Sequence, residues 1–537
     1  GPRIYNALAG DIVVTKNINN NTLVKEGPFT LTLANTANDS SLGALVNEGT
    51  LVLAGTINNC LGSTLSINTN GTVRLVGSAN NTDQIHFNQR VIMNGGKFQH
   101  QHVRGLTTPN TLEEIASLSG SNLNSIVENG QALSTNRLDI GGGSAHRGIY
   151  AGTIRDGAAG VLGLQVYRHN NFQQFNGTNT YTGVTLINNQ SGSGAVRYIM
   201  NGAHLGDPTT STYTLNANQP DRFAYLNGSG VISASTINLN ANAIIAPGGS
   251  LSADLVDTAT FAESVATLTI SNAVNLNTAT AMLELEVNGT TPGVTYDRVV
   301  IAGSGTISNN NGNLKITLGY TPASGDKFTI VDVEGTDSAK TMGTFGSFNS
   351  VPSSMAQGAI IVDPNTGQSF RISYRAEGST FDMGAGLGNN IMLEAISPVG
   401  GAQITWRGNL SSDWDVITAN WRLAGDVASI FNNADFVTFD NFGSNSSPIN
   451  LVGDLTPATI NFNSTNNYEF GGAGKLTGLV ILTKTNTGKV TITTDNDNSG
   501  ATLHRQGIIQ IGTNGTSGLL SGNISMTTNS TLIFNRS

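Results

Sequence analysis

The sequence predicts an all-β fold built from many short strands that stack on one another. Charged residues make up 11 % of the 537-residue chain, and 65 residues are Gly. Ordinary globular domains contain roughly 25 % charged residues. Small neutral residues favour tight turns, and the recurring Val, Ile and Leu favour strands. The third observation is apolar alternation over four to seven residues, which is typical of strands with one buried face.

The alternating segments are each too short to form the face of a sheet alone. Examples are GTLVLAG (49–55), STLSIN (63–68), GTVRLVG (71–77), STINLNANAII (235–245) and ATLTISNAVNL (266–276). Stacked on copies of itself, each segment would add one strand to a continuous sheet. Helical periodicity is hard to find, and its best candidate is the segment 110–120.

Internal repeats support stacking. GTNTYTGVTLINN (177–189) aligns with TTDNDNSGATLHR (493–505), and the stretch 22–77 has the same order of turns and strands. With roughly 20–25 residues per coil, such repeats form a solenoid whose coils lie ~4.8 Å apart. Each coil is then stabilised by its neighbours rather than by one central core.

Several phrases, in a fixed order, resemble the autotransporter-associated β-strand repeat family of large secreted or surface-displayed bacterial proteins. They are YAGTIRDGAAGVLGLQV (150–166), FNGTNTYTGVTLINN (175–189), GSGVISASTINLNANAIIAPGGSL (228–251), ELEVNGTTPGVTYDRVVIAGSGTI (284–307), YTPASGDKFTIVD (320–332), WRGNLSSDWDVITANW (406–421) and DFVTFDNFG (435–443). The resemblance covers most of the chain. It implies a right-handed parallel β-helix, an extracellular location at the bacterial cell surface, and a structural or adhesive role.

The chain divides into three predicted regions. Residues 1–250 have the pattern of β-solenoid repeats, whereas residues 251–398 have longer alternating strands and longer loops. The resemblance implies that this second region closes the solenoid as a capping or sandwich-like end. Residues 399–537 have the pattern of a second repeat unit opened by a Trp-rich cap. The family pattern is incomplete at LIFNRS, so we expect the natural protein to continue beyond Ser537.

All three tryptophans of the chain, Trp406, Trp414 and Trp421, lie within sixteen residues. A carbohydrate platform needs exposed, coplanar aromatic faces flanked by polar groups. A structural plug needs the same rings turned inward, where they hide the open end of a solenoid. The position at the start of a unit favours the plug, and a glycan platform is the alternative.

The end coil of a solenoid carries unpaired strand edges, which favour association unless they are covered. The segment GDIVVTKNINN (10–20) has this position in the sequence. We therefore predict that Asp11, Ile12, Val13 and Val14 form an assembly strand that pairs with a second copy of the chain.

Signals for ion binding are weak. Asp495, Asp497 and Ser499 follow the first half of an EF-hand loop, but Gln506 stands where the bidentate Glu would be. The single Cys60 excludes an intramolecular disulfide and a Cys-rich zinc site, and we expect it to be a small buried side chain.

Signals for catalysis are also weak. His100 and His102 have the spacing of one strand face, but no third metal ligand lies near them in the sequence. Carboxylates are dispersed, and the adjacent Glu113 and Glu114 would point to opposite faces of a strand, so no acid–base pair is evident.

Charge and length narrow the functional classes. The net charge is −9 and the 26 Lys and Arg residues are scattered, which argues against nucleic-acid binding. No apolar run approaches the ~20 residues of a transmembrane helix. We expect a non-catalytic extracellular structural protein that binds other copies of itself, without cofactor or metal. The first alternative is an adhesin with a glycan- or receptor-binding surface, and the second is a β-helix enzyme that degrades polysaccharides.

Overall fold

The computed structural model describes all residues except 1, 19–21, 40, 57–58, 77–82, 102–111, 132–133, 144, 159, 255–256, 354, 379, 383–387 and 397–400. Contacts divide the chain into two compact units. Unit 1 comprises Gly1–Ile361 and Arg371–Ala395, and unit 2 comprises Val362–Phe370 and Ile396–Ser537. Every described element is a β-strand except one 3-10 turn, η1 (Ser338–Lys340). The all-β prediction is therefore confirmed, whereas the division into three regions stays a prediction.

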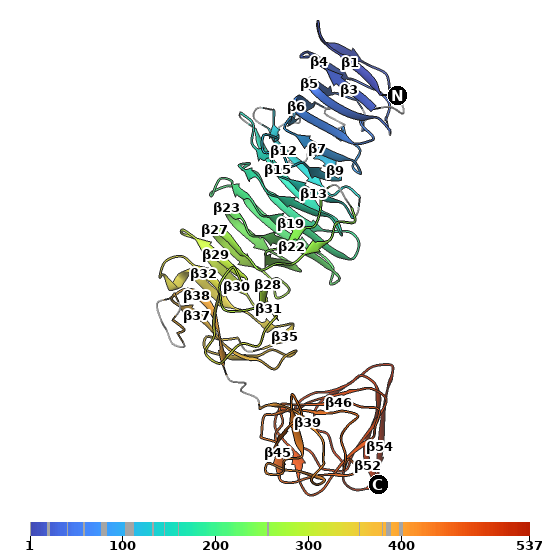
Figure 1. Cartoon of the computed structure of the whole chain (residues 1–537), viewed down its shortest axis with the longest axis vertical. Helices are drawn as coiled ribbons and strands as arrows, with labels where there is room; N and C mark the ends of the chain where they lie inside the picture. Colours follow the sequence, from blue (N-terminus) through green and yellow to red (C-terminus); the bar gives the residue numbers. More distant parts are fainter. Residues whose placement is uncertain are drawn as a thin grey trace. The chain divides into compact units, whose positions relative to one another are not determined.

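Three large sheets make up unit 1, and Figure 1 shows their strands stacked in chain order from β1 to β35. The first sheet has eleven strands: β1 (Arg3–Asn6), β2 (Ile12–Val14), β3 (Thr22–Glu26), β4 (Thr30–Leu33), β5 (Gly43–Leu53), β6 (Leu65–Leu75), β7 (Arg90–Asn94), β8 (Lys97–His100), β10 (Ser117–Ser119), β11 (Ile126–Asn129) and β14 (Thr153–Arg155).

The second sheet has sixteen strands: β9 (Leu112–Ile115), β12 (Thr135–Ile140), β15 (Val161–Tyr167), β17 (Thr178–Asn179), β18 (Thr185–Asn189), β20 (Ala203–Leu205), β21 (Thr212–Ala217), β23 (Val231–Leu239), β27 (Thr267–Leu276), β29 (Arg298–Ala302), β30 (Ile307–Asn310), β32 (Lys327–Val333), β33 (Thr341–Thr344), β36 (Ile360–Val362), β37 (Ser369–Ala376) and β38 (Asn390–Ile396). The third has nine: β13 (Arg147–Tyr150), β16 (Phe172–Phe175), β19 (Gly194–Met200), β22 (Arg222–Gly228), β24 (Ala243–Pro247), β28 (Met282–Val287), β31 (Asn313–Leu318), β34 (Ser347–Phe348) and β35 (Val351–Pro352).

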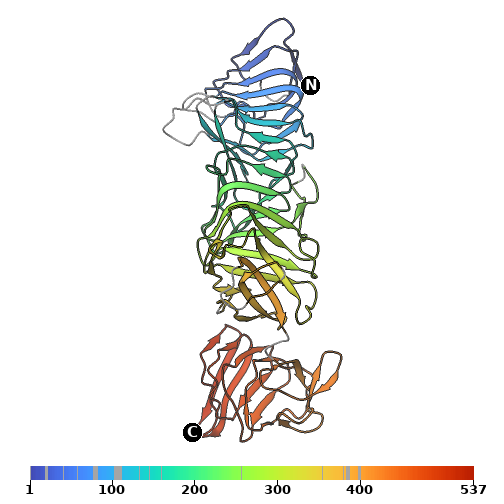
Figure 2. The ribbon, with the colours of Figure 1, turned by 90° about the vertical axis from the view of Figure 1, so that its left-hand side faces the viewer.

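Inward side chains stack directly on one another from coil to coil, which is why short strands suffice. One such ladder lies within the first sheet, and its members are at most 1 % exposed: Leu31, Leu51, Val73, Phe98, Val127 and Ile154. Burying an aliphatic or Phe side chain of this kind contributes about 1.5–3 kcal/mol. The stacked parallel strands confirm the β-helix prediction, and Figure 2 shows the stack from a second direction.

The helical alternative for residues 110–120 is wrong in the part that the structure describes. Residues 112–115 form β9, which pairs in parallel with β12, and residues 117–119 form β10, which pairs in parallel with β7. Pairing with neighbouring coils decides the conformation here, because a short segment has little helical preference of its own.

Coil length is not constant along unit 1. Neighbouring coils near the N-terminus place Asn47 and Asn68 21 residues apart, as predicted, whereas Asn238 and Asn275 are 37 residues apart. The extra length between these two asparagines contains β25 (Ser250–Leu251) and β26 (Phe261–Ala262), an antiparallel pair. We call residues 248–254 and 257–266 the strap.

The strap lies back over earlier coils of unit 1. Asp254 accepts a hydrogen bond from the Ile149 amide at 2.8 Å, and Asp257 forms an ion pair with Arg90. The Arg197 guanidinium lies 4.1 Å from the centre of the Phe261 ring. The strap therefore links coils that do not contact one another through sheet pairing.

Antiparallel pairs close unit 1. Strand β32 continues the parallel stack on one side and pairs antiparallel with β38 on the other, and β34 pairs antiparallel with β35. The change of direction ends the coil pattern at this point, while the capping role of residues 251–398 stays a prediction.

Unit 2 is a shorter parallel stack of the same kind. Its eight-stranded sheet contains β39 (Gln403–Trp406), β41 (Trp421–Leu423), β42 (Val427–Ser429), β43 (Phe436–Phe439), β46 (Thr459–Asn463), β49 (Ile481–Thr485), β51 (Thr502–His504) and β53 (Ile524–Met526). Its six-stranded sheet contains β40 (Asp413–Trp414), β44 (Ile449–Leu451), β47 (Tyr468–Gly471), β50 (Lys489–Ile492), β52 (Gly507–Gly515) and β54 (Ser530–Arg536). A further pair consists of β45 (Asp454–Leu455) and β48 (Lys475–Leu476).

Candidate assembly edge and aromatic cap

The first coil of unit 1, which we call the edge coil, consists of β1, β2 and the residues that join them. Among the strands that the structure describes, β1 pairs only with β3 and β2 only with β4, both in parallel. Each strand thus has one edge whose backbone groups have no strand partner there, and such an edge is a template for pairing with another chain.

The predicted assembly residues lie in and next to β2. Ile12 and Val14 are half-buried and stand in register with buried leucines of β4, so they face the interior. Val13 points outward and is 63 % exposed. Asp11 accepts a hydrogen bond from the Thr30 amide at 2.8 Å, which holds the turn before β2 against the start of β4.

Two further apolar side chains of the edge coil reach solvent. Ile4 in β1 is 68 % exposed, and Leu8 in the following turn is 66 % exposed. Together with Val13 they give the coil exposed apolar surface beside an unpaired edge. Ile4 and Leu8 carry no signal in the sequence, because each belongs to a short segment without clear alternation.

The tryptophans of unit 2 lie together inside its first coil. Trp406, Trp414 and Trp421 are all fully buried. The Trp421 ring centre is 5.1 Å from that of Trp406 and 5.1 Å from that of Trp414, both with edge-to-face geometry. Edge-to-face pairs contribute about 0.5–1.5 kcal/mol beyond area burial. A plug requires this inward geometry, whereas a glycan platform requires exposed ring faces, which these residues lack.

The strand arrangement covers one side of the same end of unit 2, whereas β40 pairs only with β44 among the described strands. β39 pairs in parallel with β43, and its other edge pairs antiparallel with β41, which in turn pairs antiparallel with β42. The edge strand is then β42, which is only three residues long. Short edge strands offer little surface for pairing. We call β41, β42 and the three tryptophans the aromatic cap.

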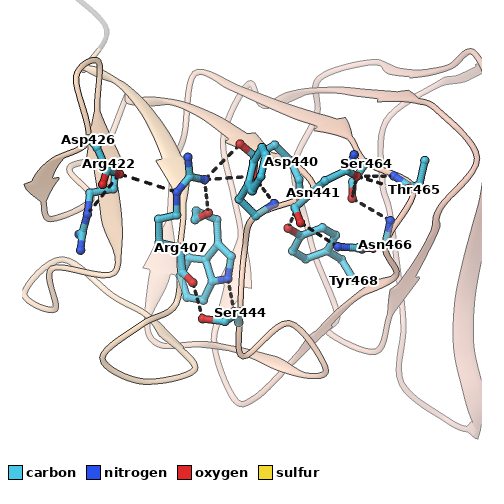
Figure 3. Close-up of polar contacts among 12 residues, drawn as sticks. Arg407, Arg422, Asp426, Asp440, Asn441, Ser444, Ser464, Thr465, Asn466 and Tyr468 are labelled. Carbon is cyan, nitrogen blue, oxygen red and sulfur yellow. Dashed lines mark hydrogen bonds and ion pairs between the residues drawn. The ribbon is translucent and has the colours of Figure 1, made fainter.

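Polar contacts hold the first coil of unit 2 to the coils that follow it (Figure 3). Arg407 donates to both carboxylate oxygens of Asp440 at 3.0 and 3.1 Å, and Ser444 donates to the Arg407 carbonyl. The Tyr468 hydroxyl donates to the Asp440 carbonyl at 2.5 Å. Burial raises the pKa of Tyr468 to about 12, so its hydroxyl remains a donor at neutral pH.

Asn441 extends this network to the next coil. Its side-chain oxygen accepts from the hydroxyl of Ser464 and from the amide of Thr465, and its carbonyl accepts from the side chain of Asn466. The turn that follows β43 is thereby fixed to the turn that follows β46. The first coil of unit 2 is thus closed by rings inside and by hydrogen bonds at its corners.

A buried lysine recurs in both units and was missed in the sequence. The Lys25 ammonium donates to three backbone carbonyls, those of Glu26, Gly27 and Glu48, at 2.6–2.9 Å. The Lys484 ammonium does the same with Thr485, Asn486 and Gln506 at 2.6–3.2 Å. Burial lowers the pKa of Lys484 to about 8.

The same glycine position accompanies each lysine. Gly49 and Gly507 both have φ in the left-handed region, and a Cβ atom on either would lie 2.8 Å from the lysine nitrogen. The signal in the sequence is a lysine followed within two residues by Gly or Asn, with a second Gly about one coil later. These residues seal a corner of the solenoid.

The three residues that suggested a calcium site each bond to a different group of the protein. Asp495 accepts from the Gly518 amide at 2.8 Å, Asp497 forms an ion pair with Lys475 at 2.6 Å, and the Ser499 amide donates to the Gly478 carbonyl. Across the described parts of the chain, no group of three or more His, Cys, Asp or Glu residues is placed to hold a metal ion.

The remaining candidates of the sequence are buried or undescribed. His100 is buried in β8, and His102 lies outside the described residues. Glu113 is fully buried and Glu114 is half-buried, so the two point to opposite faces as predicted. Cys60 is buried, as predicted, and burial raises the pKa of its thiol to about 12, which keeps it protonated at neutral pH.

Comparison with known proteins gives no relative, because no family model and no curated protein matches this chain. In the described residues, no helix has the length and apolar character needed to cross a membrane.

Proposed function

We propose that the chain is a non-catalytic structural segment of an extracellular bacterial surface or fibre-forming protein, and that it self-associates through the edge coil. The single observation that carries self-association is the combination of unpaired edges on β1 and β2 with the exposed side chains of Ile4, Leu8 and Val13. Unpaired edges supply backbone donors and acceptors, and apolar side chains beside them supply burial energy on pairing.

The stacked parallel architecture supports the structural role. Each added coil lengthens the stack, and neighbouring coils supply its stability. The resemblance of the phrases quoted above to the autotransporter-associated β-strand repeat family supports the extracellular location.

Electron microscopy and sedimentation over a range of protein concentrations test the proposal. We expect ordered polymers without added partner, and we expect them to disappear when Ile4→Lys and Val13→Lys are combined. Lysine on an edge strand opposes pairing, because its ammonium would have to lose water in the interface. The matched control is Leu123→Lys, which changes a side chain that is 72 % exposed in a turn away from the edge coil.

Two outcomes contradict the proposal. One is a monomer at every concentration, and the other is a polymer that the edge variant forms as readily as the unchanged chain. Loss of polymers in the Leu123→Lys control would show that an added charge prevents polymer formation wherever it is placed. That result would also contradict a specific role of the edge coil.

A further inference from the structure

One side of unit 1 carries a column of asparagines that spans successive coils of the second sheet. The column begins on β18 and ends on β33, with one member in each of six successive levels. Its members are Asn188, Asn216, Asn240, Asn277, Asn310 and Thr344. Six levels of a parallel sheet span about 24 Å. Each of the six residues follows or precedes a buried residue in the chain, so all six side chains lie on the outward face. The buried neighbours are Ile187, Leu215, Leu239, Leu276, Asn309 and Phe345.

Two hollows lie along this column. The first, of about 460 Å³, is lined by the polar residues Asn188, Thr214, Asn216, Asn240 and Thr278 and by the apolar residues Leu186 and Ala241. The second, of about 710 Å³, begins at the next residue, Ala279, and is lined by hydroxyl, amide and apolar side chains of the closing region. Because Thr278 and Ala279 are consecutive, the two hollows adjoin. We call the column and the two hollows together the trough.

The trough contains no ionisable side chain. None lines either hollow, and the segments 185–189, 212–217, 236–241, 273–278 and 306–311 contain no charged residue. The outward face of the third sheet differs, since it carries Arg147, Arg197, Glu284 and Lys315. The absence of charge is therefore a property of the trough and not of the whole solenoid, since β29 and β32 of the second sheet itself carry the ion pair of Arg298 and Asp332.

Several amides of the trough have hydrogen-bonding capacity to spare. Asn277 donates to the Asn240 oxygen at 3.1 Å, so those two amides are partly satisfied. The side chains of Asn188 and Asn216 make no hydrogen bond to any described residue, and the Asn188 oxygen is shielded from solvent. The Asn188 and Asn216 side chains are half-buried and line the first hollow, so the parts of their amides that solvent reaches can bind hydroxyl groups of a ligand there.

We propose that the trough binds an uncharged polysaccharide chain lengthwise. Hydroxyl groups both donate to and accept from amides, and a neutral chain loses no ionic hydration in a site without counter-charges. Nucleic acid or an acidic glycan would need cations that the trough lacks. An added peptide strand would need a free sheet edge, but the central strands β21, β23 and β27 are paired on both sides. A second copy would need an apolar or aromatic centre, which the amide column does not offer.

Isothermal titration calorimetry with cellohexaose, laminarihexaose and maltohexaose tests this proposal on the whole chain. We expect saturable binding of at least one of them, weaker binding of the matching disaccharide, and no dependence on salt concentration. Hexagalacturonate, the acidic comparison, should not bind. The double variant Asn188→Ala, Asn216→Ala should weaken binding about tenfold, because two hydrogen bonds are lost.

Folding of the double variant should be unaffected, because neither amide bonds to a described residue, and thermal unfolding checks this. The matched control is Asn124→Ala, an exposed asparagine outside the trough, which should bind as the unchanged chain does. The proposal is overturned if no neutral hexasaccharide binds, if the double variant binds equally well, or if hexagalacturonate is preferred.

Self-association is measured in the same preparations, and it separates this proposal from the one on the edge coil. We expect the double variant to polymerise as the unchanged chain does. If the double variant loses polymers but keeps glycan binding, the trough is instead a contact between copies of the chain, and the proposal is overturned.

Discussion

The first coils of the two units are built from the same kind of strand and end differently. In unit 1 the edge coil has Ile4, Leu8 and Val13 in solvent, and its strands have one partner each among the described strands. In unit 2 an antiparallel pair covers β39, and three tryptophans fill the interior beneath it. The difference teaches that closing a solenoid takes two components: short strands of reversed direction for the backbone, and large rings for the space that a missing coil would fill.

The interior corners of the two units, in contrast, are alike. Lys25 and Lys484 each bind three carbonyls, and a left-handed glycine stands beside each ammonium. The units therefore share the way coils are joined and differ in the way an end is finished. Variants of single residues can separate these two properties. All three tryptophans lie in unit 2, so their fluorescence reports unfolding of that unit alone.

The largest loss of stability should come from Trp414→Ala. The ring is fully buried and packs edge-to-face on Trp421, Phe431 and Phe470, so its removal leaves a cavity that costs about 3–5 kcal/mol of the free energy of unfolding of unit 2. Urea unfolding followed by the fluorescence of the two remaining tryptophans measures the change. In unit 1, Tyr5→Ala should cost far less, because Tyr5 is half-exposed in the edge coil.

Trp414→Phe is the control for the aromatic cap. The Trp414 Nε1 atom has no hydrogen-bond partner in the described parts of the chain, so Phe keeps most of the packing and loses no hydrogen bond. An Ala variant as stable as the Phe variant would show that the cap does not hold the first coil of unit 2 together.

Lys484→Met should lower the free energy of unfolding of unit 2 by a smaller amount, about 2 kcal/mol, and Lys25→Met should do the same in unit 1. Each substitution keeps the buried stem and leaves three carbonyls without their donor. Tryptophan fluorescence measures unit 2 and far-ultraviolet circular dichroism measures unit 1. The exposed Lys16→Met is the control and should leave stability unchanged. Unequal losses at Lys25 and Lys484 would show that the two corners differ in energy despite their common geometry.

The smallest effect, when it is measured over one pH unit, is a pH dependence that belongs to unit 1. Burial raises the pKa of Asp297 to about 7 from its ordinary 3.8. The folded state therefore holds a proton that the unfolded state releases, and this contribution to stability is lost as the pH rises from about 4 to 7, with a slope of at most ~1.4 kcal/mol per pH unit. Asp297→Asn should flatten the slope seen by circular dichroism.

Asp221→Asn, which makes the same substitution at an exposed position, serves as the control variant for the pH experiment. The Asp297→Asn variant is also expected to be less stable overall, because the Asp297 carboxyl accepts from the amides of Ala266 and Glu286 through both oxygens and an amide side chain has only one acceptor. An unaltered slope after Asp297→Asn would contradict the assignment of this proton to Asp297.

Alternation and repeats in the sequence were sufficient to predict the strands and their stacking, because inward residues of a solenoid follow a local period of two. The position of the tryptophans at the start of a unit likewise indicated where a cap would lie. Features that depend on distant residues were not predictable. Arg90 and Asp257 are 167 residues apart, and nothing near either of them signals the ion pair.

The candidate sites also differ in whether the local sequence was sufficient to predict them. The strand containing Val13 was identified because edge position follows from order along the chain. The asparagine column was not, although its members recur as alternating Asn in segments such as 236–241, because alternation alone does not tell which outward faces line up. That requires the register between coils, which insertions such as the strap change.

The strap has a mechanical consequence. A solenoid pulled along its axis comes apart one coil at a time, since each coil is held only by its neighbours. Through Asp254, Asp257 and Phe261 the strap fastens the region after β24 to Ile149, Arg90 and Arg197, so several coils there must yield at once. Under tension, extension should therefore stop at the middle of unit 1 until a larger force is applied.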